Sequence, residues 1–205
     1  MNPSKSASRL PAARTVILAS TSRYRRELLE RLRIAFRCEN PGLDEALLLG
    51  EPARDRAVRL AVAKARVVAE RYPQALVIGS DQVCSAAGII QRKPGSAAAN
   101  REQLQQLSGQ TAVFFTAVAV VSMEAGVWLQ TLDETRCVLR QLTPAEIAGY
   151  VAAEQPFDCA GGFKAEGLGI TLLERIESSD PTALIGLPLI WTASALRDSG
   201  VTPQY

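Results

Sequence analysis

Residues 15–32 read TVILASTSRYRRELLERL and join a short apolar run to a helical pattern through three hydroxyl residues. The apolar run predicts a buried strand, and the recurring leucines predict a helix from about Ser22 to Ile34. Arg23, Arg25 and Arg26 fall near the start of that helix, where unpaired backbone N–H groups already carry partial positive charge. Because these cations also repel one another, the turn favours a bound anion.

The same alternation of strand and helix patterns continues along the chain and predicts an α/β fold, with helices flanking a mixed, twisted central sheet. Two long apolar runs on either side of EAG (124–126) predict a hairpin. The run 75–84 is expected to be a strand that meets an abrupt polar turn at Asp81. Strands are expected at 15–19, 35–38, 75–84, 111–123 and 127–139, and helices at 22–34, 52–72, 95–109 and 142–154, with a buried core helix at 183–196.

Length and composition favour a single globular domain over residues 14–205, preceded by a disordered tail at 1–13. The 23 basic and 21 acidic residues nearly balance, which gives no general case for a polyanion-binding surface, so any positive site must be local and no nucleic-acid partner is expected. The tail lacks the apolar core of a signal peptide, and the longest apolar segment, 183–196, is too short to span a membrane. We therefore expect no membrane partner and a cytoplasmic protein.

The chain contains no histidine and four cysteines, and both facts limit its chemistry. Without histidine, Ser-His-Asp and Cys-His nucleophiles and H-E-x-x-H zinc sites are excluded. Cys38, Cys84, Cys137 and Cys159 form no C-x-x-C pair, so we interpret them as buried free thiols in a reducing compartment. The chemistry must then rely on carboxylates, amines, hydroxyls or a bound metal.

Lysines in three segments are candidate ligands of an anion. Lys64 shares a helix face with an apolar stripe of three alanines and a valine, so its stem either follows the surface or its ammonium meets a ligand. Lys93 precedes a proline and is expected in an extended loop. Lys164 lies in DCAGGFKAEGLGI (158–170), whose small residues either admit a ligand close to the backbone or form an exposed turn.

Carboxylates accompany these cations. Glu45 lies in a loop, Asp81 follows a buried apolar run, and Glu166 lies near Lys164. An aspartate after a strand is commonly a turn former or a helix cap, but the strand-like QVC after Asp81 leaves no helix to cap. An excess of cations over a few carboxylates is typical of a metal-assisted phosphate site, where the carboxylates hold Mg²⁺ or Mn²⁺ and orient water.

An ordered set of segments gives the chain a family resemblance. The segments ILASTSRYRRELL, LDE, LAVAKA, IGSDQV, RKP, FFTAVAV, CAGGFKAEGLGI and DPTALIGLPL follow one another between about Val16 and Leu196. In these segments the chain resembles the Maf family of nucleoside triphosphate pyrophosphatases. The resemblance implies two lobes around a cleft, an architecture related to inosine triphosphatase, and commonly a homodimer. It also implies hydrolysis of a nucleoside triphosphate between its α- and β-phosphates with a divalent cation: Mg²⁺, Mn²⁺ or Co²⁺.

The resemblance further implies roles for single residues. Asp81 would accept a proton, and Glu45 and Asp81 would hold the metal. A set of hydroxyl and cationic side chains would bind phosphate, namely Ser20, Arg25, Arg26, Lys64, Lys93 and Lys164.

Three positions bear on the choice of base. Tyr24, Gln82 and Glu166 are similar to the Maf subgroup that acts on 7-methyl-GTP, whereas the dTTP/UTP subgroup typically has aspartate and glutamine at the last two positions. A 7-methylated purine is cationic, which favours an aromatic face and a carboxylate that accepts its N1 and N2 hydrogens. The alternatives are a pyrophosphatase for dTTP/UTP or for a broader range of modified nucleotides, and a nucleotide-binding regulator of septum formation with little turnover.

Overall fold

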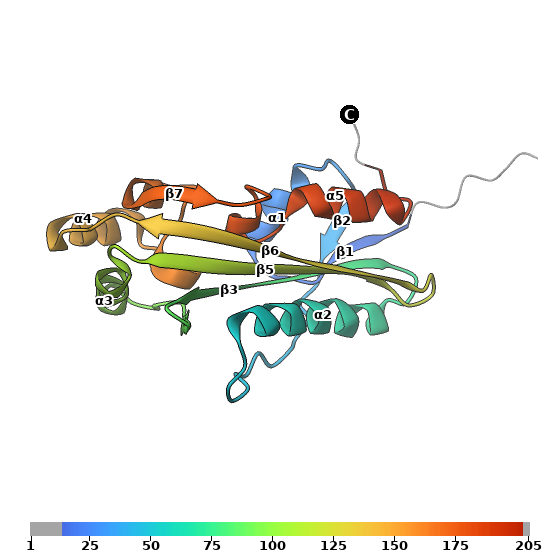
Figure 1. The fold of residues 1–205 in the computed structure, drawn as a ribbon. Helices are drawn as coiled ribbons and strands as arrows, with labels where there is room; N and C mark the ends of the chain where they lie inside the picture. Colours follow the sequence, from blue (N-terminus) through green and yellow to red (C-terminus); the bar gives the residue numbers. More distant parts are fainter. Residues whose placement is uncertain (1–13, 203–205) are drawn as a thin grey trace, which may run out of the picture.

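The computed structural model describes residues 14–202, and the predicted tail at 1–13 lies outside them. Figure 1 shows a central sheet with helices on both faces and further helices at one end, so the predicted α/β class is confirmed. The strands are β1 Val16–Leu18, β2 Phe36–Cys38, β3 Leu76–Ala86, β4 Ile89–Gln91, β5 Thr111–Ser122, β6 Val127–Leu139 and β7 Leu173–Glu177. The helices are α1 Arg23–Glu30, α2 Ala53–Arg71, α3 Ala97–Leu107, α4 Pro144–Glu154 and α5 Leu189–Asp198, with 3₁₀ turns η1 Ala160–Gly162, η2 Leu168–Leu172 and η3 Ala183–Ile185.

In the described part of the chain, seven strands form one mixed sheet in the order β2-β1-β3-β5-β6-β7, with β4 paired to β3. Strand β1 runs parallel to β2 and β3, whereas the other described pairs are antiparallel. The long hairpin of β5 and β6 pairs from Thr111 with Val138 to Ser122 with Val127. The predicted mixed sheet and its hairpin are therefore confirmed.

Strand β3 is longer than predicted, because it continues through Asp81 to Ala86. The prediction of an abrupt turn at Asp81 is wrong. Strand β5 pairs with β3 along nearly its whole length and places Ala117 opposite Asp81. On the other side, the β1 pairing reaches only as far as Leu18 opposite Ile78. The second half of β3 is thus free of β1, and space opens beside Asp81.

Helix α2 lies on one face of the sheet (Figure 1) and buries its apolar stripe against β3 and β5, as predicted. Its small residues face Gly79 of β3, where a Cβ would collide with the backbone of Ala61 and Ala65. Glycine at this position lets helix and strand approach closely. The approach brings Lys64, on the same helix face and 5% exposed, down to the sheet.

Helices α1 and α5 cover the opposite face of the sheet (Figure 1). Leu28 and Leu29 of α1 pack with Leu189 and Leu196 of α5 and with apolar residues of β1, β3 and β5. The two faces of β1 therefore belong to different clusters of the core, as expected for a strand buried on both sides. This burial holds the carboxyl end of β1 in a fixed place.

Two predicted helices differ from the structure by more than two residues at an end. Helix α1 ends at Glu30 rather than Ile34, because the turn that follows places Arg33 at a φ of 50°. The predicted helix at 183–196 is a 3₁₀ turn followed by α5, which begins after Pro188. Proline has no N–H for an internal helical hydrogen bond, so it stands at the N-cap. None of the helices within residues 14–202 has the length and apolar composition needed to cross a membrane.

A second core lies at the end of the sheet that α3 and α4 cover (Figure 1). Leu104 of α3 and Ile147 of α4 pack there with Phe114 of β5. Helix α4 begins as predicted, and Thr143 and Glu146 form a reciprocal capping box. The sheet therefore carries two lobes, and the predicted two-lobed α/β architecture is confirmed.

The cysteines agree with their prediction in part. All four are free, and Cys84 and Cys137 are buried. Cys38 is exposed on the short edge strand β2, and Cys159 is half-buried in a loop, so the prediction of burial is wrong for these two. Edge strands and loops expose side chains that the interior of a sheet would cover.

Candidate active site

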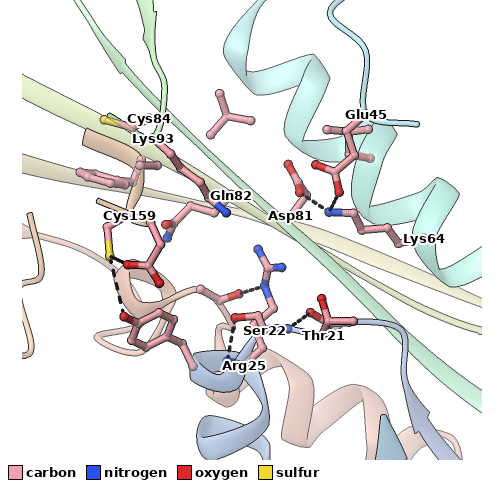
Figure 2. Close-up of a pocket in the computed structure, with 18 of the residues that line it drawn as sticks. Thr21, Ser22, Arg25, Glu45, Lys64, Asp81, Gln82, Cys84, Lys93 and Cys159 are labelled. Carbon is pink, nitrogen blue, oxygen red and sulfur yellow. Dashed lines mark hydrogen bonds and ion pairs between the residues drawn. The ribbon is translucent and has the colours of Figure 1, made fainter. Parts of the chain in front are cut away.

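A cavity of about 1350 Å³ opens where the two lobes meet. One part of its lining comes from the β1–α1 turn, the loop before α2, α2 itself and β3, and another part from residues in 90–93, 158–166 and 184–186. Figure 2 shows side chains from these segments directed toward a common space. Because β1 ends at Leu18, its carboxyl end opens into this cavity, which is where ligands bind in α/β sheets.

The turn between β1 and α1 presents hydroxyl groups and an arginine. Ser20 Oγ accepts the N–H of Ser22 at 3.1 Å, and Ser22 caps α1 by accepting the N–H of Arg25 at 3.5 Å. The Arg25 guanidinium points into the cavity (Figure 2). Burial lowers the pKa of Arg25 against the opposing influence of Asp81 and Glu45, but a guanidinium keeps its charge at neutral pH.

Lys64 joins two carboxylates in the cavity. Its Nζ lies 2.6 Å from Asp81 Oδ1 and 2.6 Å from Glu45 Oε1. The Lys64 and Asp81 side chains are 7% and 8% exposed, whereas that of Glu45 is 48% exposed. Burial raises the pKa of Glu45, but Lys64, Arg25 and Lys93 outweigh burial and hold it below its ordinary value. The Lys64 ammonium therefore meets anionic groups instead of following the surface into solvent.

The backbone carbonyl of Gly186 fixes the position of Arg25. It accepts the Nε–H of Arg25 at 3.0 Å and the hydroxyl of Ser80 at 2.9 Å. Ser80 is fully buried and directly precedes Asp81 on β3. The sequence did not reveal this role. The only local signal was the presence of a glycine at position 186, where the φ of 126° disfavours other residues.

The Gln82 amide ties β3 to the η3 turn. Its Nε2 donates to Thr116 Oγ1 at 3.0 Å and to the carbonyls of Ala183 and Leu184 at 3.0 and 2.9 Å. The Thr116 hydroxyl donates to the same Ala183 carbonyl at 3.0 Å. Because Nε2 is engaged in this way, the carbonyl oxygen is the side-chain group left to Gln82, which lines the cavity, for contact with a ligand.

A different part of the cavity is aromatic and acidic. It is lined by Tyr24, Asp158, Cys159 and Glu166, and Figure 2 shows Cys159 across the cavity from Glu45 and Lys64. The Arg23 guanidinium lies over the Tyr24 ring, 4.7 Å from its centroid, and donates to the Tyr24 hydroxyl at 2.8 Å. Burial raises the pKa of Tyr24, and burial raises the pKa of Cys159 to about 11, so neither is charged at neutral pH. This wall suits a planar cation.

Most of the predicted site residues meet in this cavity. Those that line it are Ser20, Tyr24, Arg25, Glu45, Lys64, Asp81, Gln82, Lys93 and Glu166. They come from segments that lie far apart in the sequence, as a shared site requires.

The structure does not bring Arg26 or Lys164 into the lining, which corrects the expectation that both face the anion. Arg26 is one residue beyond Arg25, about 100° further around the helix, and it pairs in the open with Glu30 at 2.9 Å. Lys164 Nζ lies 3.7 Å from Glu154 Oε1 of α4 and donates to the Glu154 carbonyl at 3.5 Å. Each of these two cations pairs with a nearby glutamate: Arg26 with Glu30, and Lys164 with Glu154.

The residues around Lys64 fit a hard divalent cation. Glu45 and Asp81 direct carboxylate oxygens toward one point, which the Lys64 ammonium holds. Mg²⁺ commonly binds proteins through one or two carboxylates and completes its shell with water and phosphate oxygens. Between residues 14 and 202, no cluster of three or more acidic, cysteine or histidine side chains offers a full metal cage. Further ligands for a cation would therefore come from water and a bound phosphate.

The fold and the cavity together define a two-lobed α/β protein whose cation-lined cleft can hold a polyphosphate. Comparison with known proteins then gives its family: the sequence profile described as Maf-like protein matches residues 15–199. The chain belongs to the Maf family, and the predicted resemblance is confirmed.

The chain is also similar to two named relatives and, more distantly, to a solved structure. A 7-methyl-GTP pyrophosphatase of Polaromonas sp. is 52% identical, over 93% of this chain and 87% of that protein. A second, from Xanthomonas campestris pv. campestris, is 51% identical, over 90% of this chain and 96% of that protein. The solved structure of the Staphylococcus aureus Ham1 protein matches with a TM-score of 0.47 at 14% identity, over 76% of this chain and 90% of that one.

Proposed function

We propose that this protein hydrolyses 7-methyl-GTP to 7-methyl-GMP and pyrophosphate with the help of a divalent cation. The observation that carries the proposal is the convergence of Arg25, Lys64 and Lys93 on the cavity that holds Asp81 and Glu45. Phosphoryl chemistry depends mainly on positioning and on neutralising the charge of the phosphates, which such a set of side chains supplies. The relatives named 7-methyl-GTP pyrophosphatase, at about half identity, support the substrate.

Hydrolysis between the α- and β-phosphates needs one water molecule. The water oxygen bonds to one phosphorus of the bridge, the bond from that phosphorus to the bridging oxygen breaks, and 7-methyl-GMP and pyrophosphate separate, the bridging oxygen staying with the fragment whose phosphorus was not attacked. Asp81 would accept the proton that the water loses, while Lys64 keeps Asp81 and Glu45 in place. Arg25 and Lys93 would bind the non-bridging oxygens. A divalent cation bound by Glu45 and Asp81 would supply further positive charge at the phosphates.

The aromatic and acidic wall supports a cationic base. Methylation at N7 gives guanine a positive charge, which the Tyr24 ring and the carboxylates of Asp158 and Glu166 attract. The N1 and N2 hydrogens of guanine also match the acceptor oxygens of Glu166 and Gln82. Uracil or thymine would instead turn two carbonyl oxygens toward a carboxylate, which repels them.

The experiment that tests the proposal is a panel of triphosphates: 7-methyl-GTP, GTP, UTP and dTTP, each with Mg²⁺, Mn²⁺, Co²⁺ or a chelator. We expect the highest kcat/KM for 7-methyl-GTP, equal amounts of 7-methyl-GMP and pyrophosphate, and no turnover with the chelator. Equal turnover of dTTP and 7-methyl-GTP would contradict the choice of base. Failure to release pyrophosphate from any triphosphate would contradict the class of reaction. A homodimer and a cytoplasmic location stay predictions.

Replacing Glu166 with glutamine should weaken the preference for 7-methyl-GTP. The amide keeps one acceptor oxygen but loses the charge that attracts a cationic base, so we expect kcat/KM for 7-methyl-GTP to fall at least about tenfold relative to UTP. Competition between the two substrates in one reaction measures this ratio directly. Glu174→Gln, at an exposed glutamate of β7, is the matched control and should leave the ratio unchanged. If Glu166→Gln leaves the ratio of kcat/KM for 7-methyl-GTP and UTP unchanged, Glu166 does not contribute to the selection of the base.

Replacing Gly186 with alanine should misplace Arg25 without filling the cavity. The new Cβ would lie 3.6 Å from Arg25 Cγ and Nε, which is ordinary contact, so the strain comes from the φ of 126°. We expect the free energy of unfolding to fall by about 1–3 kcal/mol and KM for 7-methyl-GTP to rise. Thermal unfolding and steady-state kinetics measure the two effects. Gly149→Ala, in α4 with open space around it, should instead stabilise the protein.

A further inference from the structure

The loop from Asn40 to Glu51 carries Glu45 into the cavity but has little regular structure of its own. Among the described residues, one backbone-to-backbone hydrogen bond closes within it, from Glu51 N to the Leu48 carbonyl at 3.2 Å. Its tip, residues 47–49, exposes three leucine side chains. A loop of this kind does not by itself hold a carboxylate in one place. Within the loop, Asp44 Oδ1 accepts the N–H of Ala46 at 3.1 Å, and contacts from outside the loop add to the positioning of Glu45.

Two arginines of α2 supply such contacts by binding the carbonyl groups of the loop. Arg56 donates from Nη2 to the Glu45 carbonyl at 2.6 Å and from Nη1 to the Ala46 carbonyl at 3.1 Å. Arg59 donates from Nη2 to the same Ala46 carbonyl at 3.3 Å and to Glu51 Oε2 at 2.7 Å. The side chains of Arg56 and Glu51 are 12% and 9% exposed. The Arg59 side chain is 34% exposed, and the hydrogen bonds to the Glu45 and Ala46 carbonyls lie on the exposed side of the loop, so the two arginines hold it through several bonds together.

We propose that Arg56 is a positioning residue that sets the place of the Glu45 carboxylate, a role that rests on the proposed function of Glu45 in holding the cation. Helix α2 holds Glu45 at two points, with Arg56 at its carbonyl and Lys64 at its carboxylate. Arg56 and Lys64 are eight residues apart, which places them on the same face of the helix about two turns from each other. One helix thus fixes both ends of Glu45.

The chemistry of the side chain explains why arginine stands at this position. A guanidinium is a planar fork that can donate to two carbonyl oxygens at once, whereas a lysine ammonium is a single point of charge. Arg56 lines the cavity, yet both of its Nη atoms donate to the loop. Its Nη–H groups are therefore already engaged with the carbonyls of Glu45 and Ala46. The geometry assigns it an effect on catalysis through Glu45 rather than through the substrate.

Hydrogen exchange of the loop tests the proposal without any substrate. We expect amide exchange in a peptide that covers residues 43–50 to rise in Arg56→Met and, to a smaller extent, in Arg56→Lys. Arg66→Met is the matched control, because Arg66 lies on the exposed side of α2 and pairs only with Glu70, at 2.8 Å, among the described residues. It should leave exchange in the loop unchanged. Exchange at the wild-type rate in Arg56→Lys and Arg56→Met would overturn the proposal.

A double-mutant cycle then tests whether Arg56 acts through Glu45. We expect Arg56→Met to lower kcat/KM for 7-methyl-GTP about tenfold in the wild-type background and to have no further effect when Glu45→Gln is already present. The same loss in both backgrounds would show a direct contact with substrate and overturn the proposal. A wild-type protein that hydrolyses none of the triphosphates would contradict the proposed function instead, and the exchange experiment would still decide the positioning role.

Discussion

Asp81→Asn should lower kcat for 7-methyl-GTP by about 10³-fold, within the range that a lost general base produces. Asparagine has the shape of aspartate and keeps an oxygen that can accept from Lys64, whose Nζ lies 2.6 Å from Asp81 Oδ1. The amide does not accept a proton from water, so the loss should fall on the chemical step. Rapid-quench measurement of a single turnover separates this step from binding.

The affinity of Asp81→Asn for a non-hydrolysable analogue of the triphosphate provides the internal comparison. Without a divalent cation in the binding assay, we expect its Kd to stay within a few-fold of the wild type, because Arg25 and Lys93 remain in place. Asp55→Asn, at an exposed aspartate in the first turn of α2, controls for the loss of a negative charge and should retain full turnover. Near-normal turnover by Asp81→Asn would mean that another group accepts the proton.

Lys64→Met should have the second large effect, on both stability and turnover. The substitution leaves the Asp81 carboxylate, 8% exposed, without its ammonium partner, and breaking a buried pair in this way costs about 3–5 kcal/mol. Chemical denaturation measures the loss. Adding Asp81→Asn to Lys64→Met should restore part of the stability, because the unpaired charge is then gone. If the double variant is less stable than the wild type by the full sum of the two single losses, the two side chains do not interact.

The cost of Lys64→Met should also depend on pH. Lys64 holds the pKa of Glu45 below its ordinary value, so the folded wild type binds this proton less readily than the unfolded chain. The stabilisation by that pair is therefore fully present above the unfolded pKa of about 4.3 and is lost as the pH falls through the lower folded pKa. We expect the difference in unfolding free energy between wild type and Lys64→Met to be largest near pH 7 and to shrink below about pH 4. A difference that grows at acidic pH would contradict the ion pair.

Much of the architecture could be predicted from local patterns. The small-residue stripe of α2 placed Lys64 on a buried face, and the Thr143–Pro144 start of α4 and the β5–β6 hairpin appear where their patterns indicated. These features depend on periodicity and caps, which are encoded within about a dozen residues. At α1 the helix-start pattern did not show which arginine faces the cavity. In the structure Arg25 lines the cavity, whereas Arg26 pairs with Glu30 outside it.

Other features could not be predicted because they depend on contacts between distant segments. The polar pair Ser80–Asp81 looked like the end of a strand, yet β5 supplies pairing partners on one side and the ion pair with Lys64 satisfies the Asp81 carboxylate. The Gly186 carbonyl that binds Arg25 lies 161 residues away along the chain. The grip of Arg56 on the Glu45 loop likewise has no local pattern that would reveal it.

The continuity of β3, β5 and β6 has a mechanical consequence. These strands pass from one lobe into the other without interruption, and their paired residues contribute to the cores of both. A hinge needs residues whose dihedral angles can change freely, and a hydrogen-bonded ladder restrains them. Widening the cleft therefore requires elastic twisting of a three-stranded ribbon. A nucleotide too large for the cleft would then be excluded by the stiffness of the sheet, independently of any side-chain contact with its base.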